Sequence, residues 1–311
     1  MAAGTAQAIG VVAACLAALA AADPRPVFGV GVLRRDGVVI PFAAYNGKRW
    51  ETSWPVPRLD VTVPIDVRAV PSDWWGPTPP LYSWDAWTGR AIPQPLEVTQ
   101  LDWVDAHCVR QVGLRTTYRS DKPAPPATVQ PYPKDGFVVS PPQAVEPIEL
   151  LSPSAPEVQA MTADLLAAFN KAERLVETEY GHPIKPRARE GVAPEVEAVY
   201  AYGREPRVYY VEATRSYRKL GQSAGECEAI AFGTGWFVRD GGKIRSLSTV
   251  VDLLRCDRYG ASYMFPFGVM RLDGKLFWLA QFSGWNGERF VVVEITPKRV
   301  EARINVFGGG C

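Results

Sequence analysis

Histidine is scarce in this chain, which narrows the metal and acid–base chemistry that the sequence supports. Its 311 residues include two histidines, His107 and His182. The spacings of common metal sites, such as H-E-x-x-H, C-x-x-C and the calcium-binding loop, do not occur. Asp105 and His107 would share one face of a strand, but two ligands do not make a metal site. We therefore predict neither a metal centre nor a bound cofactor.

Signatures of nucleotide and nucleic-acid binding are also missing. The phosphate-binding pattern G-x-x-x-x-G-K-[ST] is absent, and Gly233-Thr234-Gly235 lacks the third glycine of a dinucleotide site. The 34 Lys and Arg residues nearly balance the 33 Asp and Glu residues, which gives a formal net charge of +1. Because the two signs are interspersed, no basic stripe is available for a nucleic acid. We predict no nucleic-acid partner.

A serine nucleophile has little support. Residues 221–225 (GQSAG) match the G-x-S-x-G pattern of serine hydrolases. That pattern needs a helix after the serine and a histidine later in the chain. Both histidines precede Ser223, and the residues that follow it have the composition of a strand. We interpret the segment as a loop of small residues and predict no catalytic residue.

Charge is absent from residues 1–22, where Ala, Val, Leu and Ile dominate. The run ends in three alanines, and Asp23 and Pro24 follow at once. A short apolar segment with small residues at its end is typical of a secretory signal peptide. Cys15 lies in a lipobox-like context, so a lipoprotein is an alternative, as is an apolar N-terminal helix or anchor. No later run is long enough to span a bilayer, and we predict an exported, soluble domain over 23–311.

Four cysteines remain beyond the expected signal peptide, which permits two disulfides in an exported chain. Residues 229–238 and 243–254 resemble two strands joined by the turn Arg239-Asp240-Gly241-Gly242. This hairpin would place Cys227 nearly opposite Cys256. We predict the bridge Cys227–Cys256 and, by elimination, the bridge Cys108–Cys311, with Gly308–Gly310 as a flexible tail before the last cysteine. Four free buried thiols are the alternative.

The composition favours a turn-rich β protein, since the chain holds 28 Pro, 27 Gly and 10 Trp. Residues 31–37 (GVLRRDG) match residues 268–274 (GVMRLDG) at five of seven places, and 235–241 is a looser third copy. Each of the two closer copies precedes an apolar strand and an Asn-Gly turn. In the last third we predict six strands, near 228–238, 243–254, 261–271, 274–283, 288–296 and 299–306.

Repeated hairpins cannot bury their apolar faces alone, so they stack or close into a ring. The sequence therefore favours a mainly β fold of antiparallel hairpins in a propeller-like ring, with the last two strands joining the first two in one blade. The alternative is a pair of packed β-sandwich or meander units. Similar Asp-Gly turns can also arise independently in unrelated hairpins.

The middle of the chain departs from this pattern. Residues 121–156 are rich in proline, which favours extended segments and argues against a central strand. An inserted amphipathic helix follows over 157–180. Its N-terminus has the capping-box spacing of Ser154 and Glu157, and Gly181 ends it. Its apolar residues recur every three or four positions: Val158, Met161, Leu165, Phe169, Ala172 and Val176.

Tryptophan and aspartate are concentrated in residues 73–107. Aromatic faces beside carboxylates suit carbohydrate recognition, and two carboxylates at the right separation could hydrolyse a glycosidic bond. Tryptophan is also a common core residue, and exposure cannot be read from sequence. The candidate binding residues are Trp74, Trp75, Trp84, Asp85, Trp87, Asp102, Trp103 and Asp105.

From the sequence we predict an exported, non-catalytic binding or structural module of the cell envelope or extracellular space. A glycan or an envelope protein is the expected partner. The alternative is a secreted glycan-binding protein or glycoside hydrolase that uses segment 73–107. A concave groove holding exposed aromatic rings would favour sugar binding, whereas tryptophans buried between sheets would favour a scaffold.

Overall fold

The computed structural model describes residues 28–52, 54–55, 64–66, 68, 70, 83–89, 92–126, 129–141, 143–218, 227–285 and 287–311. The expected signal peptide and residues 221–225 lie outside this part of the chain. Within it, the protein is mainly β, with sixteen strands, a long helix and a short one. All strand pairings are antiparallel, as the sequence predicts.

The N-terminal part forms a six-stranded barrel. Its order is β1-β7-β4-β5-β6-β2, and β2 closes the barrel by pairing with β1. Leu33, Trp84 and Leu114 belong to the apolar cluster that fills it. The short strand β3 (Trp50–Glu51) pairs with β2. The barrel strands are β1 (Phe28–Arg34), β2 (Val38–Tyr45), β4 (Ser83–Trp87), β5 (Gln94–Ala106), β6 (Val109–Thr116) and β7 (Lys134–Ser140).

Two open sheets follow in the chain. The five-stranded sheet has the order β12-β11-β10-β9-β8, and the four-stranded sheet has the order β13-β14-β15-β16. The strands of the first are β8 (Glu149–Leu151), β9 (Glu195–Tyr202), β10 (Arg207–Tyr217), β11 (Ala229–Asp240) and β12 (Lys243–Leu254). Those of the second are β13 (Tyr263–Leu272), β14 (Lys275–Gly284), β15 (Gly287–Ile295) and β16 (Val300–Gly310).

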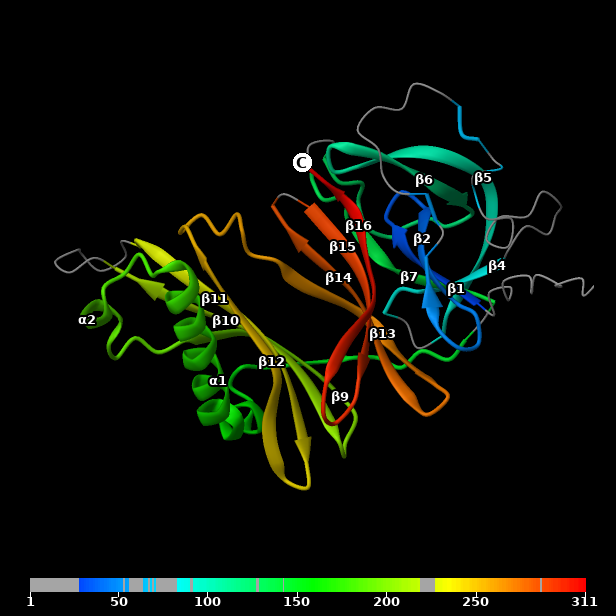
Figure 1. Cartoon of the computed structure of the whole chain (residues 1–311). Coiled ribbons are helices and arrows are strands. Elements are labelled where there is room, and N and C mark those ends of the chain that lie inside the picture. The colour runs from blue at the N-terminus through cyan, green and yellow to red at the C-terminus, as the bar shows by residue number, and fades with distance from the viewer. Residues whose placement is uncertain are drawn as a thin grey trace, which may run out of the picture.

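The elements stack in four layers, from α1 (Pro156–Tyr180) through the five-stranded and four-stranded sheets to the barrel (Figure 1). Val158 and Met161 of α1 pack on one face of the five-stranded sheet. The other face of that sheet meets the four-stranded sheet through a cluster that includes Trp236 and Trp278. The far face of the four-stranded sheet packs on the barrel through Phe42 and Phe290. The four-stranded sheet is therefore apolar on both faces.

The long helix confirms the predicted apolar stripe, because Val158, Met161, Leu165, Phe169 and Ala172 are all buried. The expected capping box is wrong. Ala155 is the N-cap residue and no side chain caps the helix, while the Ser154 hydroxyl bonds that of Ser152 at 2.8 Å. Gly181 ends the helix as expected, with a φ of 82° that favours glycine. A four-residue helix, α2 (Pro186–Arg189), follows. Neither described helix is both long and apolar enough to cross a bilayer.

The described strands do not form the propeller-like ring that the repeated hairpins favour. The β1–β2 hairpin lies in the barrel and the β13–β14 hairpin in a separate sheet, and β15 pairs with β14 and β16. The similarity of residues 31–37 to residues 268–274 has a local cause. Gly31 and Gly268 each lie at a β-bulge, and a Cβ atom at either would be within 3 Å of a neighbour. The two sandwiched sheets are closer to the alternative of packed units.

The proline-rich segment contains a central strand, contrary to the sequence prediction. Strand β7 lies between β1 and β4 in the barrel. Its seven residues, Lys134–Ser140, contain no proline, although Pro133 and Pro141 flank them. Proline excludes only the positions that must donate a ladder hydrogen bond, so a proline-free window suffices for a strand.

Both predicted disulfides are present. Cys227 and Cys256 have Cα atoms 5.9 Å apart, and Cys108 and Cys311 have Cα atoms 5.2 Å apart. Gly308–Gly310 is not a loose tail but the buried end of β16. A Cβ atom at Gly309 would be 2.2 Å from the carbonyl oxygen of Ala106. The glycines are needed because two backbones approach closely there.

Candidate functional site

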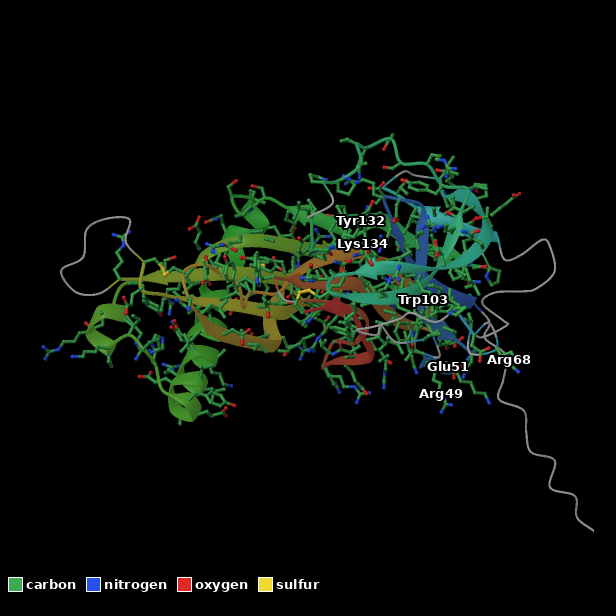
Figure 2. The ribbon with its side chains drawn as sticks, turned by 90° about the horizontal axis from the view of Figure 1, so that it is seen from above. Arg49, Glu51, Arg68, Trp103, Tyr132 and Lys134 are labelled. Atoms are coloured by element: carbon green, nitrogen blue, oxygen red, sulfur yellow. A yellow bond between two sulfur atoms is a disulfide. The ribbon has the colours of Figure 1, made fainter. Side chains whose placement is uncertain are left out.

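The candidate tryptophans of segment 73–107 do not form a shared surface where the structure describes them. Trp74 and Trp75 lie outside the described residues. Trp84 is 1% exposed and belongs to the cluster inside the barrel. Trp87, on the opposite face of β4, packs against the cluster between the barrel and the four-stranded sheet. Trp103, labelled in Figure 2, packs partly buried against the barrel interior.

The three candidate aspartates do not come together in one site. Asp102 pairs with Arg115 at 2.5 Å and Asp105 with Arg110 at 3.5 Å. The two aspartates are three residues apart on β5, so their side chains point to opposite faces of the strand. Asp85 lies on β4 and is partly exposed. A pair of carboxylates facing one substrate is not found among these three residues.

One trio of side chains has the composition of a metal site. Ligand atoms of His107, Cys108 and Cys311 lie within 4.8 Å of one another. The two sulfurs are bonded to each other, so neither is a thiolate that a metal ion could bind. The trio is therefore part of a disulfide linkage between the β5–β6 turn and the end of β16.

A solvent-open groove lies between the five-stranded and four-stranded sheets. Its volume is about 600 Å³, within the range typical of ligand sites. Trp236 of β11 forms one wall, and residues of β14, β15 and β16 form the floor. The groove forms where the five-stranded sheet does not cover the edge strand β16. Ala302 and Phe307 of that strand are exposed and line the groove.

The floor consists of side-chain rows that run across the strands. Phe282 pairs with Arg289, and Arg289 pairs with Phe307, so one row holds a guanidinium between two phenyl rings. The next row along β15 places Val291 opposite Asn305. All five residues line the groove. Cross-strand neighbours on one sheet face lie about 5 Å apart, so aromatic, cationic and polar groups are presented together.

Tyr259 lines the groove and forms an aromatic stack that joins two connections. Tyr259, in the β12–β13 connection, stacks on Trp285, in the β14–β15 turn, with ring centroids 4.3 Å apart. Trp285 is 60% exposed and Tyr259 is 50% exposed. Cys256, three residues before Tyr259, forms a disulfide with Cys227. Arg258, next to Tyr259, forms an ion pair with Glu197 at 2.6 Å. These two linkages hold the Tyr259 connection in place.

Glu288 and Arg289 are the charged residues among the described groove lining. Because they are adjacent on β15, their side chains point to opposite faces, Arg289 into the groove and Glu288 toward the barrel. Both carboxylate oxygens of Glu288 accept bonds from the Lys134 ammonium, at 2.8 and 2.6 Å. Lys134 also donates to the carbonyl oxygen of Tyr132 at 2.8 Å; both residues are labelled in Figure 2. Burial lowers the pKa of Lys134, and the neighbouring Glu288 opposes that shift. Arg289 has no acidic partner among the described residues.

The described groove lining does not supply the pair of carboxylates found in glycoside hydrolases. Glycoside hydrolysis requires two carboxylates, one on each side of the scissile bond. Among the described residues that line the groove, Glu288 is the one acidic residue, and its carboxylate lies on the barrel-facing side of β15, where Lys134 neutralises it. The described lining of the groove offers aromatic rings, a guanidinium, an amide and a hydroxyl group.

Sequence reasoning missed Tyr259, Trp285 and Phe307 because it followed the local density of tryptophan. Trp285 stands alone in a turn, and Phe307 ends an ordinary strand pattern. The available signal was an aromatic residue in the Asn-Gly turn at 285–287, where burial is unusual.

No protein-family model matches the chain, and neither a curated protein nor a solved structure shows significant similarity to it.

Proposed function

We propose that this protein is an exported, non-catalytic binding module that holds a glycan in the groove between its two sheets. The observation that carries the proposal is that the row of Phe282, Arg289 and Phe307 lines the same groove as Tyr259, which stacks on the exposed Trp285. Exposed aromatic side chains gathered in a concave, structurally supported site are more typical of ligand sites than of ordinary surface.

The chemistry of the lining suits a saccharide. Sugar rings present C–H faces that pack on aromatic rings, while their hydroxyl groups need hydrogen-bond partners. The groove supplies the rings of Phe282 and Phe307 beside the polar side chains of Asn305 and Ser262.

Two features support a location outside the cytoplasm. Residues 1–22 have the composition of a secretory signal peptide. The two disulfides are the form that cysteines take in oxidising compartments. A glycan of the cell envelope or the extracellular space would be accessible there.

A glycan-array screen of the purified protein tests this function. Phe307→Ala should weaken or abolish binding, because it removes an exposed ring of the groove lining, and Trp285→Ala should weaken it, because the lining residue Tyr259 loses its stacking partner. Tyr180→Ala is the matched control, since Tyr180 is 82% exposed at the end of α1, which packs on the opposite face of the five-stranded sheet. Absence of glycan binding by the parent protein, or full binding by both groove variants, would refute the proposal.

A further inference from the structure

We infer that the groove selects acidic glycans and that Arg289 pairs with the carboxylate of the bound sugar. This inference rests on the proposed glycan-binding function and specifies its ligand class. It is carried by one asymmetry across β15: the Glu288 carboxylate is paired and buried on the barrel-facing side, whereas the Arg289 guanidinium faces the groove without an acidic partner among the described residues.

The pairing of Glu288 is complete on the protein side. Lys134 contacts both of its oxygens, and the side-chain amide of Gln281 donates to Oε2 at 3.0 Å. Glu288 and Lys134 are both nearly inaccessible to solvent. The pair therefore contributes little net charge to the groove, and Glu288 does not repel an incoming anion.

Arg289 supplies an unopposed positive charge. Its side chain is exposed and lines the groove, and it forms no ion pair or side-chain hydrogen bond with any described residue. A guanidinium presents a planar set of donors that matches a carboxylate through two parallel hydrogen bonds. A neutral sugar would leave this charge uncompensated at the site of contact.

The aromatic neighbours of Arg289 would hold the carboxylate of a bound sugar next to the guanidinium. Phe282 and Phe307 flank it across the strands, so a sugar ring packed on either phenyl would hold its carboxylate beside the guanidinium. The two rings also exclude water from the sides of the pair, which strengthens the electrostatic attraction relative to an open surface. The aromatic and cationic groups thus recognise two parts of one ligand.

The test compares oligogalacturonate with its fully methyl-esterified form, which keeps the sugar backbone and removes the charge. Isothermal titration of the parent protein should give at least about tenfold tighter binding of the acid form, as expected for a charge-assisted contact. Arg289→Gln should remove this preference, so that the affinities for the acid and the ester become nearly equal. Arg289→Lys should retain part of the preference, because it keeps the charge but not the planar donor set.

Lys171→Gln is the matched control, because it removes one positive charge from the exposed side of α1. The control should keep the preference for the acid form. Equal binding of acid and ester by the parent protein, or an unchanged preference in Arg289→Gln, would overturn the inference and leave the glycan-binding function standing. Absence of binding to both forms and to every glycan of the array would overturn both.

Discussion

The indole of Trp285 stacks on the phenol ring of Tyr259, with centroids 4.3 Å apart and planes inclined by 17°. The two residues belong to different sheets' connections, since Tyr259 follows β12 and Trp285 follows β14. Their contact joins the β12–β13 connection, which lines the groove through Tyr259, to the β14–β15 turn. The stability of this contact depends on how firmly the Tyr259 connection is anchored.

The anchoring disulfide should therefore affect binding as well as stability. Cys227→Ser/Cys256→Ser should lower the free energy of unfolding by about 2–4 kcal/mol and weaken glycan binding, because the Tyr259 connection loses one of its two linkages. The matched control, Cys108→Ser/Cys311→Ser, should lose stability but keep its affinity, since that bridge lies between the barrel and β16. Chemical denaturation and titration with the glycan measure the two effects. Equal affinity in both double variants would contradict this role of the connection.

The Lys134–Glu288 pair should be costly to break from one side. Lys134→Met leaves a buried carboxylate without its cation, and we expect a loss of about 3–5 kcal/mol in the free energy of unfolding. Lys134→Met/Glu288→Gln should recover most of that loss, because it removes the unpaired charge. Urea denaturation of the single and double variants gives the coupling. A double variant no more stable than Lys134→Met would show that the pair does not act as a unit.

The stability of the protein should fall as pH rises from about 5 to 8. Glu212 is buried between the sheets, and burial raises its pKa to about 7, although the Met264 N–H, 2.6 Å from its carboxylate, opposes the shift. Between the unfolded and folded pKa values the folded state binds more protons, so its stability decreases with rising pH. Glu212→Gln should flatten this dependence by up to roughly 3 kcal/mol. Thermal unfolding measured across this pH range would contradict the assignment if parent and variant had parallel curves.

Gly309 should tolerate no side chain. Gly309→Ala would place a Cβ atom 2.2 Å from the Ala106 carbonyl oxygen at a φ of +141°, and we expect a loss of about 2 kcal/mol or more. Gly191→Ala is the control, because Gly191 also has a positive φ but nothing within 4 Å of an added Cβ. Its loss should be near 1 kcal/mol. Equal effects would show that backbone strain alone, and not close packing of β16, determines the cost.

Local patterns in the sequence predicted the elements whose signals are local. The apolar stripe of 156–180 and the Asp-Gly turns of the last third located α1 and the C-terminal strands to within a few residues. The barrel could not be predicted in this way. Its closure depends on pairings such as Gly29 with Ser140, which join residues more than a hundred positions apart without any mark in the residues between them.

The candidate site was harder to predict, for a related reason. Trp84 and Trp285 are the same residue type in turn-rich surroundings, yet one fills the barrel and the other is 60% exposed. Their difference is set by what packs over them, which is a property of the assembled sheets. The charge asymmetry between Glu288 and Arg289 is equally invisible in sequence, because Lys134 reaches Glu288 from another layer of the fold.

The most direct test of the central claim is a crystal structure of the protein with an acidic oligosaccharide. We expect a sugar packed between the two sheets, on Phe282 or Phe307, with its carboxylate on Arg289 and the Tyr259–Trp285 stack nearby. A sugar bound instead on the barrel, against Trp87 or Trp103, with the groove empty, would refute glycan binding between the sheets.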